Sequence, residues 1–284
     1  MAKNFSELKL ECTGIGSLPQ TNLEEAMDII KKYFKNIPYW PQLTNLKEDI
    51  ITLFSGDMSS FNSIGFDIFI DYIAQNKPPF AKGQITGPCT MSKELGINFS
   101  FEKLLNKAML QINKIKSASP DTTPIIFIDE PEFCYEYNLI KLFSDKLKTK
   151  NALTGLHCCK NCDWEKIIDT NVNIISFDAY LYSIEDYALN FKKFLENGGK
   201  IAWGIIPTHD KYKALNISIE ELETIFVNAV NNLTKRGINE KIIVENSLIT
   251  PSCGAGTLEN YLAERVMRLT KELSDRLKER YYDI

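Results

Sequence analysis

The most constraining feature of the chain is a repeated order of short apolar segment, polar loop and amphipathic segment along nearly all of its 284 residues. Strand-sized apolar segments that alternate with helical patterns predict βα units and a parallel sheet. The predicted strands are residues 10–18, 80–86, 124–128, 153–158, 172–177, 201–206 and 242–245. An eighth is expected within residues 45–54 or near Pro251. This count and length predict a single-domain (β/α)8 TIM barrel over residues 1–284, with an open doubly wound sheet as the alternative.

The predicted helices are recognised by apolar residues at three- and four-residue spacing. Asn22 is expected to cap the first helix, and the helices before Gly198 and Gly237 are expected to end there. The remaining predicted helices cover the second half of 53–74 and residues 101–117, 137–147, 163–169, 184–195, 218–236 and 258–278.

Composition and charge limit the kinds of molecule that we expect the protein to bind. A net charge of -4 with 25% charged residues gives no reason to expect nucleic acid or an anionic membrane as a partner. The longest apolar runs are strand-sized, and the first residues carry no apolar signal core. The seven cysteines are odd in number and clustered, so no disulfide framework is expected. They fit a reducing cytoplasm, where clustered cysteines favour metal binding or catalysis.

The segment 155–162 holds one of the two histidines and three of the cysteines. Alternate residues of a strand share a face, so His157 and Cys159 should point together and Cys158 away from them. An imidazole and a thiolate side by side suit zinc. Free cysteines are also common as small buried apolar residues, and Cys159 with Cys162 forms a Cys-x-x-Cys pair typical of redox or structural zinc sites. The residues alone leave these alternatives open.

Polar side chains recur at the carboxyl ends of the predicted strands or directly after them. In a barrel these ends form one rim, where active sites lie. The residues concerned are Gly16, Ser17, Thr86, Asp129, Glu130, His157, Cys159, Asp178, Thr208, His209 and Cys253. Asp129 and Glu130 stand before a proline and could instead be helix-capping carboxylates. The shared position of the whole set favours a metal-containing active site.

Several of these residues lie in motifs that resemble a known family. The motifs are residues 15–21 (IGSLPQT), 82–88 (KGQITGP), 128–131 (IDEP), 157–159 (HCC), 175–178 (ISFD) and 252–254 (SCG). In this order they resemble the catalytic C-terminal barrel of cobalamin-independent methionine synthases. That family belongs to a superfamily with uroporphyrinogen-decarboxylase-like and corrinoid-linked methyltransferase barrels. The resemblance spans almost the whole chain.

The resemblance implies a zinc site. Carried over by position, it makes His157, Cys159 and Cys253 ligands of Zn2+. The family's further ligand is a Glu, and Asp178, which is one carbon shorter, stands at the matching position. The metal would then lie closer to that strand, or a water molecule would bridge the gap.

The resemblance also implies an amino-acid site. Ser17, in the segment with Gly16, would bind the carboxylate of the substrate, and Asp129 its ammonium group. Asp57 is a candidate for a further substrate-binding carboxylate of the family. His209 lies near the family's His-Ser-Pro segment, although the motif is broken here, and is a candidate acid catalyst.

The implied activity is zinc-dependent transfer of a methyl group to the thiolate of homocysteine. The double-barrel methionine synthases have an N-terminal half that has no counterpart in these 284 residues. Its absence favours a methylated corrinoid protein over methyl-folate as the donor. The alternatives are methyl transfer to another small thiol, a metal-free porphyrinogen decarboxylase, and a non-catalytic zinc-binding partner of a corrinoid protein.

Overall fold

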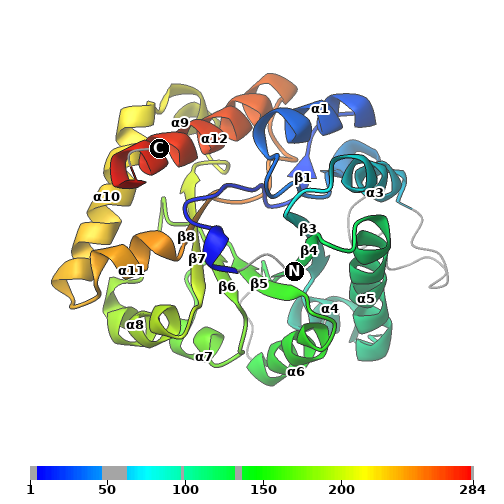
Figure 1. The fold of residues 1–284 in the computed structure, drawn as a ribbon, viewed down its shortest axis with the longest axis horizontal. Coiled ribbons are helices and arrows are strands. Elements are labelled where there is room, and N and C mark those ends of the chain that lie inside the picture. Colours follow the sequence, from blue (N-terminus) through cyan, green and yellow to red (C-terminus); the bar gives the residue numbers. More distant parts are fainter. Residues whose placement is uncertain (1–4, 47–62, 97–98, 132–135, 283–284) are drawn as a thin grey trace.

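Six parallel strands form the central sheet of this computed structural model, which describes residues 5–46, 63–96, 99–131 and 136–282. Neighbouring strands follow each other in sequence, as expected for consecutive βα units. The sheet is curved, and most helices surround it (Figure 1). The strands are β3 (Phe80–Thr86), β4 (Thr123–Asp129), β5 (Leu153–Cys158), β6 (Ile174–Phe177), β7 (Lys200–Ile206) and β8 (Ser247–Pro251). The predicted α/β class with a parallel sheet is confirmed.

A second, two-stranded parallel sheet consists of β1 (Ser17–Leu18) and β2 (Gln42–Leu43). Isolated bridges connect the chain next to these strands with the edges of the larger sheet, Cys12 with Ile249 on β8 and Tyr39 with Lys82 on β3. The predicted strand 10–18 is thus paired only at a few positions. The range 45–54, suggested for an eighth strand, lies mostly outside the described residues, and Pro251 ends β8.

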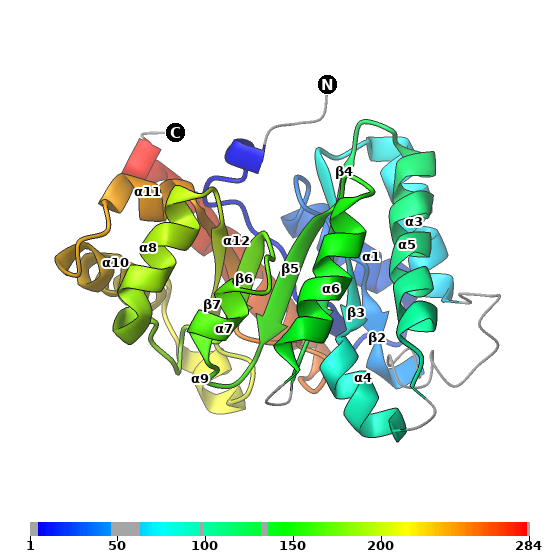
Figure 2. The same cartoon turned by 90° about the horizontal axis from the view of Figure 1, so that it is seen from below.

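The helices form an outer layer around the sheet (Figure 1). They are α1 (Leu23–Tyr33), α3 (Ile64–Asn76), α5 (Phe101–Ala118), α6 (Tyr137–Lys148), α7 (Trp164–Ile168), α8 (Ala188–Glu196), α10 (Ile219–Lys235), α11 (Glu240–Glu245) and α12 (Asn260–Tyr282). Short 3-10 helices are η1 (Phe5–Glu7), η2 (Thr44–Leu46) and η4 (Glu185–Tyr187). Two more helices, α4 (Pro88–Leu95) and α9 (Lys211–Asn216), lie beyond the carboxyl ends of the strands, at the bottom of Figure 2.

Local capping explains where several helices begin. Asn22 caps α1 as predicted, its side chain accepting a hydrogen bond from the Glu24 amide at 2.8 Å. Ser218 and Glu221 form a reciprocal capping box at the start of α10. None of the helices in the described part of the chain is long and apolar enough to cross a membrane.

The predicted strand 242–245 is wrong, because these residues belong to the helix α11. The run of Ile242, Ile243 and Val244 resembles a strand in composition. Asn239, however, caps the segment as a helix by accepting from the Lys241 amide at 2.9 Å, and the adjacent residues 243 and 244 are both buried. Tertiary packing and the cap therefore override the β propensity, and the strand begins only at residue 247.

The inner face of the curved sheet is apolar at one end and polar at the other. The apolar part is a cluster of Leu8, Ile37, Phe80, Ile125, Phe127, Ile174, Ala202 and Leu248. Further along the same strand faces come polar residues: Lys82, Gln84 and Thr86 on β3, Asp129 on β4, His157 on β5 and Ser176 on β6. The period of two along each strand places all of them on the inner side. Their polar groups are therefore gathered toward the carboxyl ends of the strands.

Gly204 provides a test of the packing between the last strands. A Cβ atom there would lie 2.4 Å from the carbonyl oxygen of Phe177 and 2.8 Å from the Cα of Ser252. Because both atoms belong to the backbone, they cannot rotate away. We expect Gly204→Ala to lower the free energy of unfolding in urea by about 1–3 kcal/mol. Leu189→Ala, at an exposed position of α8, should change it by less than about 0.5 kcal/mol, and equal effects would contradict this packing.

Candidate metal and amino-acid site

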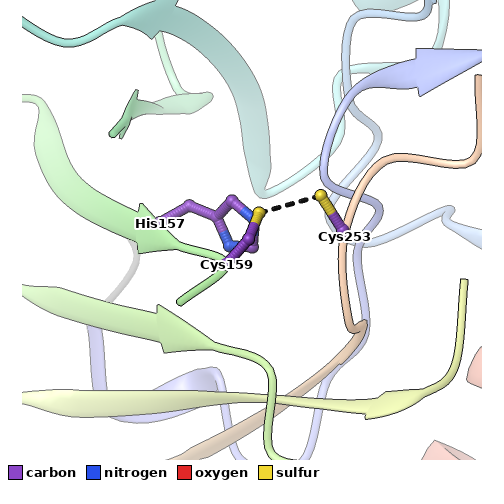
Figure 3. Close-up of side chains that lie close together, drawn as sticks. All are labelled: His157, Cys159 and Cys253. Atoms are coloured by element: carbon purple, nitrogen blue, oxygen red, sulfur yellow. Dashed lines mark hydrogen bonds between the residues drawn. The ribbon is translucent and has the colours of Figure 1, made fainter. Parts of the chain in front are cut away.

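Three side chains of the types that ligate metals meet at the carboxyl ends of β5 and β8 (Figure 3). The Nε2 atom of His157 lies 3.0 Å from the Sγ of Cys159. The Sγ of Cys159 lies 2.9 Å from the Sγ of Cys253, although the two residues are 94 positions apart. All three ligand atoms lie within 4.8 Å of one another. One imidazole and two thiols at this spacing are a donor set that fits zinc.

The strand period explains which cysteines join this group. Cys158 points to the opposite side of β5 and packs in the core between the sheet and the helices. Its sulfur lies beside that of Cys162, and both donate to the carbonyl of Lys160. Cys162 therefore contacts Cys158, whereas Cys159 and Cys253 are free thiols that contact each other.

A buried serine orients the imidazole. The Nδ1 of His157 lies 3.0 Å from the Oγ of Ser176, its neighbour in register on β6, and Ser176 is fully buried. This contact leaves Nε2 directed toward the sulfur atoms, as a partner of the second ring nitrogen does in metal sites. The sequence motif contained Ser176, but only its register beside His157 indicates this role.

A cavity of about 340 Å³ opens next to the three side chains. This volume is in the range of small-molecule sites. It is lined by Ile15, Gly16, Ser17, Gln42, Thr44, Thr86, Asp129, Pro131, His157, Cys159, His209, Cys253, Gly254, Gly256 and Thr257. Side chains that were singled out at separate strand ends in the sequence therefore surround one cavity. Asp57 lies outside the described residues.

The adjacent carboxylates Asp129 and Glu130 differ in their surroundings. Glu130 accepts hydrogen bonds from the amides of Cys89 and Thr90, at 2.9 Å each, and from the Thr90 hydroxyl at 2.6 Å. It caps the start of α4, so the helix-capping alternative holds for this residue. Asp129 instead borders the cavity, and its buried Oδ1 has no hydrogen-bond partner. Burial raises the pKa of Asp129 to about 6, and the charge of Lys82 opposes that rise.

Ser17 is attached to the loop that carries Cys253. Its Oγ accepts a hydrogen bond from the Gly256 amide at 3.2 Å, and its carbonyl accepts from the Ala255 amide at 3.0 Å. Because the Oγ acts as an acceptor here, the hydroxyl hydrogen can be donated to a ligand in the cavity. Gly254 permits this close approach, since a Cβ there would lie 2.0 Å from the Ser17 Oγ.

Asp178 and His209 complete this end of the fold. The Oδ1 of Asp178 accepts from the amides of Tyr180 and Leu181 at 3.0 Å each, which shapes the loop after β6. Asp178 is not a member of the three-residue group within 4.8 Å.

A hydrogen bond to Cys253 raises the pKa of His209. Hydrogen bonding from Cys159 lowers the pKa of Cys253, and bonds with both histidines act in the same direction.

The attachment of Ser17 to the Cys253 loop can be tested by a double-mutant cycle. Gly254→Ala should displace the Ser17 hydroxyl and lower the free energy of unfolding by about 1–3 kcal/mol. In a Ser17→Ala background the clash with Oγ is gone, so the same substitution should lower stability by at least about 1 kcal/mol less. Urea denaturation of the four proteins measures the coupling. Additive effects would mean that the two residues do not interact as described.

The chain is similar to known proteins in two respects, in part of its sequence and in its fold. No family model matches the chain. The methionine synthase of Methanocaldococcus jannaschii is 27% identical over 185 residues, which are 61% of this chain and 57% of that protein. The chain thus spans little more than half the length of this relative.

Solved structures with a similar fold have little sequence in common with the chain. A proposed α-L-fucosidase from Bacteroides thetaiotaomicron matches with a TM-score of 0.53 and 11% identity, covering 94% of both chains. A psychrophilic endo-β-1,4-xylanase of glycoside hydrolase family 10 matches with a TM-score of 0.50 and 11% identity, covering 92% of this chain and 96% of the other. At such identities the likeness concerns the fold alone. The chain therefore has an α/β fold with a curved parallel sheet like that of TIM-barrel proteins.

Proposed function

We propose that the protein is a zinc-dependent methyltransferase that moves a methyl group to the sulfur of homocysteine. The observation that carries this proposal is the meeting of one imidazole and two thiols at a cavity that Ser17 and Asp129 also border. The similarity to a methionine synthase over 61% of the chain supports the same activity.

The proposal includes a complete (β/α)8 barrel formed by residues 1–284 as one domain. In it, the short strands β1 and β2 fill the gap between β8 and β3. Two sets of backbone hydrogen bonds support this arrangement. The Leu10 amide donates to the Ser247 carbonyl at 2.8 Å on one side, and the Lys82 amide donates to the Pro38 carbonyl at 2.8 Å on the other.

His157, Cys159 and Cys253 would hold the zinc ion, with one position left for the substrate. A zinc ion bound by three protein ligands can accept the sulfur of a thiol and lower its pKa so that the thiolate exists at neutral pH. The contact of Ser176 with Nδ1 keeps the imidazole in the orientation that ligation needs. Asp178 remains a candidate for a further ligand through Oδ2, because its Oδ1 caps the loop.

The polar residues of the cavity fit the charged end of an α-amino acid. Asp129 presents a carboxylate oxygen without a partner, which can pair with the substrate ammonium group. The Ser17 hydroxyl can donate to the substrate carboxylate, and Gly16 leaves space beside it. Homocysteine bound in this way would direct its sulfur toward Cys159 and Cys253.

In the transfer step the homocysteine sulfur attacks the methyl carbon of the donor. A sulfur–carbon bond forms while the bond between the methyl group and the donor breaks, and the donor keeps that electron pair. The thiol proton passes to the imidazole of His209, which is exposed at the cavity edge and can release it to water. The donor is a methylated corrinoid protein or methyl-folate.

The alternatives receive less support from the site. A porphyrinogen decarboxylase needs cations for the carboxylates of its substrate, and the described residues that line the cavity include no Lys or Arg. It would also leave the group of His157, Cys159 and Cys253 without a role. A different small thiol could use the same sulfur position, but it would leave the unpaired oxygen of Asp129 unexplained.

Metal content tests the proposed zinc site. We expect one zinc ion per purified chain, and Cys253→Ser should weaken zinc retention at least tenfold against a competing chelator because a thiolate ligand is lost. Cys12→Ser is the control, since Cys12 is also a free thiol but is buried outside the site, beside the Tyr33 carbonyl. Inductively coupled plasma mass spectrometry gives the stoichiometry. Full zinc content in Cys253→Ser would refute the site.

Thiol selectivity tests the amino-acid part of the site. With methylcobalamin or methyl-tetrahydrofolate as donor, Asp129→Asn should reduce kcat/KM for homocysteine by about 10- to 100-fold, because a charged hydrogen bond to the ammonium group is lost. The rate with 1-propanethiol, which has no ammonium group, should change less than threefold. The measurement is the rate of thioether formation with each donor. Equal losses for both thiols would contradict the assignment of Asp129.

A further inference from the structure

Lys82 is a buried cation that the proposed reaction does not use. It lies on β3, on the same strand face as Phe80 of the apolar cluster and Thr86 of the cavity lining. Its side chain is fully buried. Removing an ammonium group from water is unfavourable unless the group is paired and hydrogen-bonded. The surroundings of this lysine should therefore show what its charge stabilises.

The ammonium group connects two walls of the cavity. Its Nζ donates to the carbonyl of Ile15 at 2.5 Å and to the Oε1 of Gln84 at 3.3 Å. It also lies 4.5 Å from the ring centroid of Phe127 on β4. Electrostatic attraction links it to Asp129, two residues further along that strand. Lys82 thus lies between the segment before β1 and the strand that carries Asp129.

The first wall is the segment of Ile15, Gly16 and Ser17. Lys82 holds the carbonyl that directly precedes Gly16. Gln84 packs against Gly16, where a Cβ would lie 2.7 Å from the Gln84 Nε2, and it donates to the Trp40 carbonyl at 2.8 Å. Through these contacts, two side chains on the inner face of β3 hold the segment of Ile15, Gly16 and Ser17 in place. They therefore determine where the Ser17 hydroxyl stands at the cavity.

The second wall is Asp129, whose Oδ1 has no hydrogen-bond partner. Asp129 and Lys82 interact electrostatically across the neighbouring strands β3 and β4. These strands are paired in register, with Thr86 of the cavity lining beside Asp129.

We propose that Lys82 is the positioning residue of the amino-acid site and holds the segment of Ile15, Gly16 and Ser17 in place for an α-amino acid. Lys82 is fully buried and is not among the residues that line the cavity. It therefore acts through the carbonyl of Ile15 and not by touching the substrate. The identity of the ligand as homocysteine rests on the proposed function, whereas the anchoring of the segment does not.

Lys200 provides a matched control. It is a second strand lysine that is almost fully buried, at the start of β7 and hence at the amino end of the sheet. Its Nζ donates to the Glu245 carbonyl and to the Asn246 Oδ1, both at 3.1 Å. Lys200→Met removes a buried ammonium group as Lys82→Met does, but far from Ser17. Effects common to both variants report general destabilisation.

Hydrogen exchange of the metal-free and ligand-free protein tests the anchoring. In Lys82→Met, the amides of Gly16, Ser17, Leu18 and Gln20 should exchange at least fivefold faster than in wild type. The same holds for the amide of Gln42, which donates to the Gly16 carbonyl at 3.0 Å. In Lys200→Met these amides should exchange at the wild-type rate. No acceleration in Lys82→Met, or equal acceleration in both variants, would overturn the proposal. Lys82→Gln carries the same expectation if Lys82→Met does not fold.

Calorimetric titration of the zinc-loaded protein tests the link to the substrate. Lys82→Met should bind homocysteine at least tenfold more weakly, bind 1-propanethiol within twofold of wild type, and retain its zinc. Lys200→Met should bind both thiols as wild type does. Equal weakening for both thiols would overturn the assignment to the amino-acid site. If wild type does not bind homocysteine, the proposed function fails, and the exchange experiment alone decides whether Lys82 anchors Ser17.

Discussion

The contact between the loops after β5 and β8 is the constraint on which the rest of the site depends. Cys159 and Cys253 are 94 residues apart in sequence, yet their sulfur atoms lie 2.9 Å apart. The parallel sheet makes this possible, because all of its strands end on the same side and its curvature turns those ends toward one another. Ser17 is attached to the second loop through the amides of Ala255 and Gly256. The proposed metal and amino-acid sites are therefore held by shared backbone contacts.

The alternation of side chains along a strand assigns different roles to adjacent residues. His157 faces the cavity, whereas Cys158 packs toward the helices and lies beside Cys162. Asp129 likewise borders the cavity, whereas Glu130 caps α4. Each pair combines one residue that lines the cavity with one that packs or caps the surrounding structure. The same alternation places the side chain of Lys82 on the inner face of the curved sheet. It lies nearer the amino ends of the strands than Thr86, which borders the cavity.

Sequence patterns predicted the parts of the fold that depend on local order. The strands near 80–86, 124–128 and 153–158 agree with the structure, because they are apolar runs bounded by turns. Residues 242–245 were predicted incorrectly, since a cap and tertiary packing decided between helix and strand. The short pairing of β1 and β2 also depends on contacts between distant segments, which periodicity does not reveal.

The candidate site was predictable where residue type and strand position sufficed. Residue type and strand position indicated His157 and Cys159, whereas Cys253 was placed after residues 242–245, which are helical. The three side chains lie close together in the structure. The roles of Ser176 and Lys82 could not be predicted, because they depend on the register between neighbouring strands and on burial. The contact of Cys158 with Cys162 could not be predicted either, since it requires the path of the following loop.

The X-ray absorption spectrum of zinc in the purified protein tests the central claim most directly. The proposed site predicts a first shell of two sulfur atoms at about 2.3 Å, one imidazole nitrogen and lighter donors, with a third sulfur after addition of homocysteine. The sulfur atoms are those of Cys159 and Cys253, and the nitrogen is the Nε2 of His157. A shell of nitrogen and oxygen alone, or an unchanged sulfur count with saturating homocysteine, would contradict the account.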